Sequence, residues 1–360
     1  MVKIKRSTIK EFECQIEKKK VICFGAGQEF QKLCKQYKLA EKLLYVVDSF
    51  NYGKNAQIGA VSVPIISFAD MKEEVKESIL VLSTIKYAQE IIEQLDEIRL
   101  LDDVCIYIPK LFSIDIDAVD YASSRQEVIP RVIHYCWFGK NEMPERFRDN
   151  IETWKRFCPD YEIKRWDESN YDITKNKYMH QAYEVKKWGF VPDYARLDII
   201  YNYGGIYLDT DVEIIKPLDY LLQFDLFCGF ESIDYVALGL GFGAKGKHDV
   251  IKKMMDVYEH LEFITSKGSY NLTPSPQYQT MVLEAAGLKK NGCTQMIQNN
   301  IILSPEYLAP INLYGIGNPT EKTFSIHQYA ATWLDEKQKQ EKERITNNYR
   351  YLIRRMKERL

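Results

Sequence analysis

Short apolar runs alternate with longer amphipathic stretches along most of this chain, and this alternation restricts the possible folds more than any other feature. Apolar strands separated by helices are typical of a parallel sheet with crossover helices on its faces. The first series of runs reads KVICFGAG, LLYVVDS, ILVLST and VCIYIP, and a second series begins at IPRVIHYCWFG. The sequence therefore predicts an α/β fold. A length of 360 residues fits two domains of roughly 150 residues each.

The predicted domain division follows from the places where the alternation stops. We predict a small Rossmann-like α/β domain over residues 1–120, a second α/β domain over residues 128–335 and a basic amphipathic helix over residues 336–360. The stretch DAVDYASSRQEV, between the two domains, shows neither strand nor helix periodicity and is the predicted linker. The last segment has apolar residues at helical spacing among lysines and arginines, so it can lie on an anionic membrane or pack on the protein's own surface.

The charge, the cysteine pattern and the length of the apolar runs limit the expected partners and the expected location of the protein. The formal net charge is −2, so no global positive field draws in nucleic acid, and none is expected as a partner. The eight cysteines include no CxxC pair and are expected to be reduced. The N-terminal residues have no apolar core of signal-peptide length, and no later run approaches the ~18 apolar residues of a membrane span. We therefore expect a cytoplasmic protein, with peripheral contact to the inner face of the membrane as an option for the C-terminal helix.

A partial dinucleotide-binding pattern occurs in the first domain. Gly25 and Gly27 follow the first apolar run, and Asp48 ends the second run, as in dinucleotide-binding folds. Phe30 stands where the third glycine of that pattern would be. The alternatives are a nucleotide-binding turn and a tight strand-to-helix turn without a ligand, and the missing glycine favours the second.

The stretch GGIYLDTD places Asp209 and Asp211 directly behind a short apolar run. Ligands of open α/β sheets bind at the carboxyl ends of strands, and two carboxylates at this spacing suit Mg²⁺ or Mn²⁺ on a diphosphate. The helix predicted just before this run carries Asp193 and Arg196, three residues apart and therefore on one face. A solvated turn and a surface ion pair are the alternatives. The direct succession of helix, Gly-Gly break and acid-terminated strand favours a site.

Around these residues the chain resembles a known family. PDYARLDIIYNYGGIYLDTDV is similar to the D-x-D region of glycosyltransferase family 32, the sugar-binding region containing a DXD motif. That family includes capsular polysaccharide transferases and the yeast initiating mannosyltransferase, and the large clostridial glucosylating toxins share its core. IPRVIHYCWFGKNEMPERFRDNIETWKRFCPDYEIKRWDE resembles the family's opening segment, and IILSPEYLAPIN and SIHQYAATW resemble its closing segments. The resemblance runs from Ile129 to Trp333 and implies a GT-A-type fold.

The resemblance also implies roles for individual residues. The expected catalytic residues are Asp193, Arg196, Asp209 and Asp211. Asp211 would ligate Mn²⁺ or Mg²⁺, with Asp209 and His327 as further ligands, while Asp209 also touches the ribose and the sugar. Asp193 and Arg196 would hold sugar hydroxyls. The expected donor-binding residues are Trp137, Asp193, Tyr194, Arg196, Gly205, Asp209 and Trp333. For Trp137, His327 and Trp333 the alternative is an ordinary structural residue.

Two further stretches stand near the expected site. LGLGFGAKGKH, residues 238–248, lacks the end of a phosphate-binding P-loop and is either a glycine-rich wall near the sugar or a tight strand followed by a helix cap. TPSPQYQT, residues 273–280, stands where the family has a Gly-Pro turn facing the donor, with Ser275 in place of the glycine.

The expected function is that of a metal-dependent, retaining hexosyltransferase with a nucleotide-sugar donor. A UDP-sugar is favoured, and the expected acceptor is a saccharide or lipid-linked saccharide of surface polysaccharide biosynthesis, capsular or lipopolysaccharide. The alternatives are a sugar-nucleotide hydrolase and a scaffold that binds nucleotide sugars without turnover. An intact set of Asp193, Arg196, Asp209 and Asp211 argues against the scaffold. No acid identifies itself from the sequence as a nucleophile for a double displacement.

Overall fold

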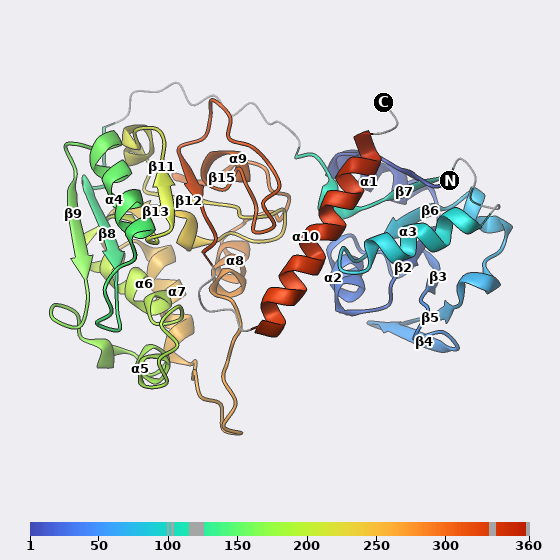
Figure 1. The fold of residues 1–360 in the computed structure, drawn as a ribbon, viewed down its shortest axis with the longest axis horizontal. Coiled ribbons are helices and arrows are strands. Elements are labelled where there is room, and N and C mark those ends of the chain that lie inside the picture. Colours follow the sequence, from blue (N-terminus) through green and yellow to red (C-terminus); the bar gives the residue numbers. More distant parts are fainter. Residues whose placement is uncertain (99–100, 102–103, 115–125, 331–335, 358–360) are drawn as a thin grey trace. The chain divides into compact units, whose positions relative to one another are not determined.

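The computed structural model describes residues 1–98, 101, 104–114, 126–330 and 336–357. The chain forms two compact units (Figure 1). The first comprises Met1–Asp115 together with Asp335–Leu360, and the second comprises Ile116–Leu334. Most of the predicted linker and Trp333, one of the predicted donor-binding residues, lie outside the described residues.

The first unit is built on a 7-stranded sheet with helices on both faces. Its strands are β1 (Lys3–Ile4), β2 (Val21–Phe24), β3 (Leu43–Val47), β4 (Lys54–Ile58), β5 (Val61–Ile66), β6 (Ile79–Leu82) and β7 (Cys105–Tyr107). Its helices are α1 (Ile9–Lys18), α2 (Gln28–Gln36), α3 (Ala88–Glu97) and α10 (Glu336–Lys357), with 3-10 turns η1 (Phe68–Asp70), η2 (Glu73–Lys76) and η4 (Pro109–Leu111). The strand order is β1-β7-β6-β2-β3-β5-β4, and every neighbouring pair is parallel except β5 and β4.

The glycine turn after β2 is held by protein groups. Gly25 has a φ of +93°, which favours glycine, and a Cβ there would lie 2.9 Å from the Ser83 hydroxyl. One carboxylate oxygen of Asp48 accepts from the Ala26 N–H at 2.8 Å, and the other accepts from the backbone N–H groups of two residues that follow it. Phe30 is fully buried in the core. Asp48 is thus used by the protein itself, which supports the tight-turn alternative.

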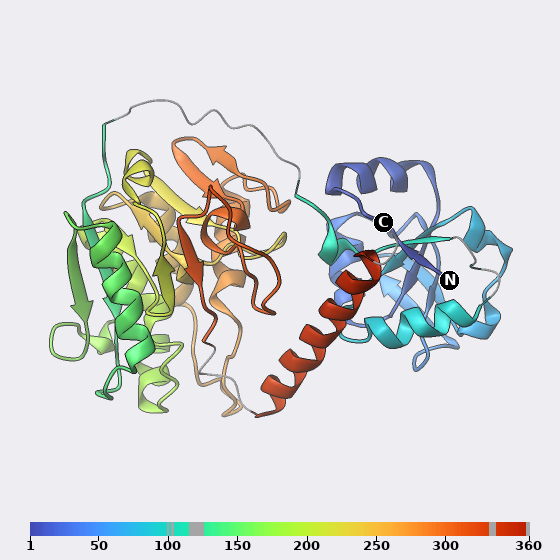
Figure 2. The ribbon, with the colours of Figure 1, turned by 45° about the horizontal axis from the view of Figure 1, so that its top comes forward.

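The predicted C-terminal helix is α10, and it packs within the first unit beside α3 (Figure 2). Leu352 is fully buried. Asn348 accepts from the Gln89 N–H at 2.7 Å, and Arg355 pairs with Asp96 at 2.5 Å. The structure therefore shows the packed alternative for this helix. None of the described helices combines the length and the apolar composition needed to span a bilayer.

The second unit contains a mixed 7-stranded sheet and a small two-stranded sheet. The large sheet consists of β8 (Val132–Cys136), β9 (Glu162–Trp166), β10 (Gly205–Tyr207), β12 (Leu226–Gly229), β13 (Phe242–Ala244), β14 (Gln295–Ile297) and β15 (Asn300–Leu303). Its order is β14-β15-β12-β13-β10-β8-β9, with β13 and β14 antiparallel to their neighbours. The small sheet pairs β11 (Val212–Ile214) with β16 (Ser325–His327) in antiparallel fashion. The predicted α/β fold is confirmed.

Helices cover both faces of the large sheet (Figure 1). They are α4 (Glu145–Phe157), α5 (Lys177–Glu184), α6 (Pro192–Tyr203), α7 (Asp249–Glu259), α8 (Ser275–Ala285) and the short α9 (Pro305–Leu308), with 3-10 turns η5 (Ile173–Lys175), η6 (Asp219–Gln223) and η7 (Leu238–Leu240). Successive strand residues point to opposite faces. Tyr207 therefore joins the core beneath α5 to α8, whereas Ile206 and Leu208 join the core beneath α4 and α9.

Candidate functional site

The two acids of the D-x-D motif lie in the turn between β10 and β11. Helix α6 ends at Gly204, whose φ of +65° turns the chain into β10. The next residue, Gly205, packs so closely on β8 that a Cβ would lie 2.7 Å from the Val132 carbonyl oxygen. Beyond Leu208 the chain leaves the large sheet, and the Val212 N–H donates to the Asp209 carbonyl at 3.1 Å. The apolar strand thus delivers both acids at its carboxyl end, as predicted.

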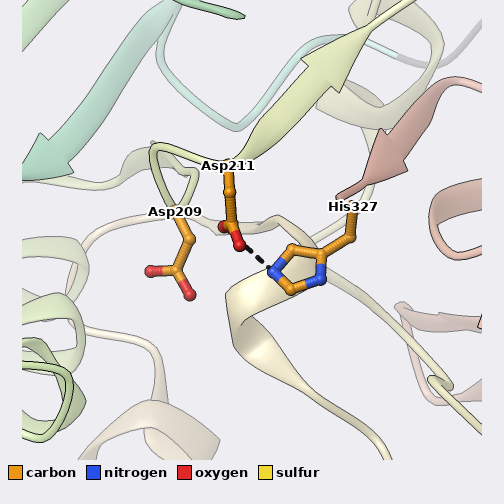
Figure 3. Close-up of side chains that lie close together, drawn as sticks. All are labelled: Asp209, Asp211 and His327. Carbon is orange, nitrogen blue, oxygen red and sulfur yellow. Dashed lines mark ion pairs between the residues drawn. The ribbon is translucent and has the colours of Figure 1, made fainter. Parts of the chain in front are cut away.

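His327 reaches this turn through the small sheet. In the β11–β16 pair His327 lies opposite Val212, and its side chain therefore stands beside that of Asp211 (Figure 3). His327 Nε2 and Asp211 Oδ1 are 3.1 Å apart. One ligand atom from each of Asp209, Asp211 and His327 lies within 4.8 Å of the others. We call these three residues the metal cluster, because two carboxylates and an imidazole are suited to Mn²⁺ and related divalent ions.

A buried ion-pair network adjoins the metal cluster. Arg196 lies 3.3 Å from a carboxylate oxygen of Asp193 and 3.3 Å from one of Asp209. The side chains of Asp193 and Arg196 are only 6% and 5% exposed. Removing one partner of such a buried pair leaves an uncompensated charge, which makes these contacts far more important than a surface pair. The predicted surface-pair alternative for these two residues is thus wrong.

Burial and charge set the protonation of this network. Burial raises the pKa of Asp193 to about 6, even though Arg196 opposes that rise. Burial likewise raises the pKa of Asp209 against the opposing charge of Arg196. Burial alone would lower the pKa of Arg196, but Asp209 and other groups nearby raise it above the ordinary value. The charged guanidinium of Arg196 therefore lies between the carboxylates of Asp193 and Asp209 and favours their ionised forms, which burial opposes.

Asp211 and His327, the other two residues of the metal cluster, stabilise each other's charged forms. Burial would raise the pKa of Asp211, but the hydrogen bond from His327 lowers it below the ordinary value. Burial would lower the pKa of His327, but the hydrogen bond to Asp211 raises it. Asp211 also accepts from the Ala330 N–H at 2.9 Å. The carboxylate that was predicted as the main metal ligand is thus ionised and is held by His327 and by the Ala330 N–H, which follows the strand β16.

Three residues near the site had no role assigned from the sequence, although Gly239 and Ser275 lie in the two stretches that were expected near it. A Cβ on Gly239 would lie 2.4 Å from Asp209 Oδ2, so this glycine allows Asp209 its position. The hydroxyl of Ser275, at the start of α8, hydrogen-bonds to Asp193. Glu231 follows β12; burial raises its pKa to about 7, and its charge acts on His327.

Gly239 lies in the stretch for which the sequence left two alternatives. It belongs to η7, and β13 begins only at Phe242, so the predicted strand is shorter than expected. The contact with Asp209 supports the glycine-rich wall.

The remaining predicted donor-binding residues occupy different places. Trp137 is half-buried against Phe147, and its indole N–H donates to the Asn141 carbonyl at 2.8 Å. Tyr194 is 7% exposed within the core beneath the helices. Gly205 lies at the opposite end of β10 from Asp209. The structure brings together the four expected catalytic residues and His327, whereas Tyr194 and Gly205 have structural surroundings that account for them.

The comparison with known families agrees with this geometry. Residues 144–228 match the family described as "Glycosyltransferase sugar-binding region containing DXD motif". The matched segment includes the D-x-D turn and the helix that carries Asp193 and Arg196. Over residues 144–228 the chain is thus similar to this glycosyltransferase family. The mixed sheet with its helices confirms the α/β part of the predicted fold class, and the GT-A type of the second unit stays a prediction.

Several relatives are mannosyltransferases. The chain is 27% identical over 227 residues to inositol phosphoceramide mannosyltransferase 1 of Schizosaccharomyces pombe, covering 59% of this chain and 64% of that protein. It is 34% identical over 110 residues to inositol phosphoceramide mannosyltransferase 3 of the same yeast, covering 28% and 30%. It is 25% identical over 193 residues to mannosyl phosphorylinositol ceramide synthase SUR1 of Saccharomyces cerevisiae, covering 49% and 48%. The chain spans less than two thirds of the length of each of these relatives.

Two solved glycosyltransferase structures are also similar. The PaToxG glycosyltransferase matches with a TM-score of 0.36 and 20% identity, covering 44% of this chain and 69% of that one. A glycosyltransferase involved in the glycosylation of the major capsid of PBCV-1 matches with a TM-score of 0.36 and 13% identity, covering 60% and 98%. At these TM-scores the likeness adds nothing to the fold assignment.

Proposed function

We propose that this chain is a metal-dependent glycosyltransferase that moves a sugar from a nucleotide-sugar donor to a hydroxyl acceptor, with retention at the anomeric carbon. One observation carries the proposal. Asp209 belongs to the metal cluster and is also in contact with Arg196, which forms a buried ion pair with Asp193. Residues 128–335 would carry the transferase site, and residues 1–120 would form a Rossmann-like domain of their own.

The residues present fit a divalent cation. Asp211 and His327 would hold Mn²⁺ or Mg²⁺ together with Asp209, since these side chains offer two hard oxygen ligands and one imidazole within 4.8 Å. When bound, the cation would stabilise the negative charge that develops on the departing diphosphate. The mixed ligand set favours Mn²⁺ over Mg²⁺, because Mg²⁺ is bound mostly by oxygen ligands.

The rest of the site would position the sugar. Asp193 and Arg196 present a fixed carboxylate and a fixed guanidinium, which hold sugar hydroxyls in one orientation. Asp209 would contact the ribose and the sugar. In the transfer the bond from the anomeric carbon to the diphosphate oxygen would break, a bond to the acceptor oxygen would form, and the acceptor proton would pass to the departing diphosphate. Trp137 would lie near the base.

The donor and acceptor are proposed as classes. A UDP-sugar remains the favoured donor, and a saccharide or lipid-linked saccharide of surface polysaccharide remains the favoured acceptor. The relatives named as inositol phosphoceramide mannosyltransferases make mannose the second sugar to test and an inositol-phosphate lipid the second acceptor. A lipid acceptor would suit peripheral membrane contact of a cytoplasmic enzyme.

A thermal-shift panel with Mn²⁺ tests the donor, because a ligand that binds only the native state raises the melting temperature. We expect one sugar nucleotide among UDP-glucose, UDP-galactose, UDP-N-acetylglucosamine and GDP-mannose to raise it more than its bare nucleotide does. Turnover of that donor should then depend on an added acceptor. Release of free sugar at the same rate with and without acceptor would indicate the hydrolase alternative, and binding without any turnover would indicate the scaffold.

A further inference from the structure

Helix α8 presents two buried polar side chains toward the acids of the site. Ser275 and Gln279 are four residues apart and therefore lie on one face of the helix. The Ser275 hydroxyl hydrogen-bonds to Asp193. Gln279 is 1% exposed. This face of α8 is thus directed at the same residues that are proposed to hold the sugar.

The orientation of the Gln279 carboxamide is determined by the backbone. Its Oε1 accepts from the Leu238 N–H at 3.0 Å. A backbone N–H can only donate, so the oxygen and not the nitrogen of the amide must face Leu238. The amide nitrogen, Nε2, is consequently fixed on the other side, where it is buried and has no hydrogen-bond partner among the described residues. A buried donor left without an acceptor is costly, so this nitrogen calls for a partner that a bound molecule can supply.

The surroundings indicate what that partner is. Leu238, which Gln279 holds, precedes Gly239 in the chain, and a Cβ on Gly239 would meet Asp209 at 2.4 Å and Arg196 at 3.3 Å. The Gln279 amide is therefore attached to the segment that lies against the proposed sugar-binding residues. The missing partner of an N–H donor is an oxygen atom, and a sugar hydroxyl offers one that can accept from Gln279 while it donates to a carboxylate.

We propose that Gln279 is a sugar-binding residue whose side-chain nitrogen donates a hydrogen bond to a hydroxyl oxygen of the donor sugar. Its oxygen meanwhile holds the Leu238 backbone beside the site. This inference rests on the proposed function and deepens it, because it names a residue that distinguishes the sugar from the nucleotide. Thr280 provides the comparison, because its hydroxyl accepts from the Val236 N–H at 2.9 Å and donates to the Val236 carbonyl at 3.4 Å, both of them backbone contacts on the same segment.

Isothermal titration with Mn²⁺ tests the proposal on the full chain, with UDP, UDP-glucose, GDP and GDP-mannose as probes. Gln279→Met removes the amide at similar volume. It should weaken binding of the favoured sugar nucleotide about tenfold, the loss expected for one neutral hydrogen bond. Binding of the bare nucleotide should change less than twofold. Thr280→Val, the matched control, should leave both affinities unchanged.

A second variant removes the hydrogen-bond donor of Gln279 but keeps the oxygen that contacts the Leu238 backbone. Gln279→Glu keeps an oxygen for the Leu238 N–H but has no amide nitrogen, so it should lose affinity for the sugar nucleotide as Gln279→Met does. Wild-type affinity in both variants, or equal weakening of nucleotide and sugar nucleotide, would overturn the inference while the proposed function stands. A wild-type protein that binds none of the sugar nucleotides would overturn the proposed function itself.

Discussion

Replacing Gly239 by alanine should disable the site without unfolding the protein. The new Cβ would lie 2.4 Å from Asp209 Oδ2, whereas an ordinary contact needs roughly 3.5 Å. Gly239 has no positive φ, so the alanine backbone itself is unstrained. The atom that is struck belongs to a side chain and not to the backbone. The carboxylate of Asp209 must therefore move by about 1 Å while the fold is retained.

The expected cost follows from that displacement. Asp209 is held 3.3 Å from Arg196 and belongs to the metal cluster, so a shift disturbs both groups at once. A misplacement of about 1 Å in a catalytic arrangement reduces the rate roughly 100-fold, equivalent to about 2.7 kcal/mol of transition-state stabilisation. Turnover should fall by that factor, and the affinity for Mn²⁺ should fall by roughly tenfold, because one of three ligands is displaced.

Gly246→Ala is the matched control. A Cβ on Gly246 would approach no atom closer than 3.7 Å, an ordinary contact, in the same unit of the protein. Both variants should melt near the wild-type temperature, and only Gly239→Ala should lose turnover and Mn²⁺ affinity, measured by electron paramagnetic resonance of free Mn²⁺. Wild-type turnover in Gly239→Ala, or equal losses in both variants, would refute the reasoning.

Four further outcomes are expected. Asp211→Ala should abolish metal-dependent turnover while circular dichroism shows a folded protein; unchanged turnover at saturating Mn²⁺ would remove Asp211 from the metal cluster. Trp137→Ala should raise the donor KM more than it lowers kcat, as expected for a stacking contact made equally in ground and transition states, and an unchanged KM would argue against contact with the base. Burial raises the pKa of Asp193 from 3.8 to about 6, so the native state binds more protons than the unfolded state between these values. The free energy of unfolding should therefore fall by about 2 kcal/mol as pH rises from 4 to 7. Asp193→Asn should remove that dependence in urea titrations, and its persistence in the variant would assign it to other groups. Leu352→Ala, in the fully buried position on α10, should lower the free energy of unfolding of the first unit by about 3 kcal/mol, whereas no change in a denaturation curve would mean that α10 is not part of that core.

Elements with a strong local signal could be predicted from the sequence. The run before the D-x-D motif is apolar throughout and ends in acids, and the helix before it has Pro192 at its start and Gly204 at its end. These features depend on residues that are close together in the chain, so they can be predicted without knowledge of the tertiary fold. The antiparallel pair of β4 and β5 was missed, because KNAQI and VSVPII are short and largely polar or interrupted by proline.

The parts of the site that were missed depend on contacts between distant segments. Gly239 matters only because η7 lies against Asp209, 30 positions earlier in the numbering. The stretch around Ser275 was expected near the donor, but the contact of Ser275 with Asp193 and the effect of Glu231 on His327 appear only in the folded chain. Even His327, which was predicted through the family resemblance, is brought to Asp211 by a strand pairing that no local pattern indicates.

The assignment of α10 to the first unit has a consequence for the order of folding. That unit uses residues from both ends of the chain, Met1–Asp115 and Asp335–Leu360, with Ile116–Leu334 between them. During synthesis all residues of the second unit are therefore added before those of the helix that packs on α3. The core of the first unit therefore gains the buried Leu352 side chain only after the second unit has been synthesised.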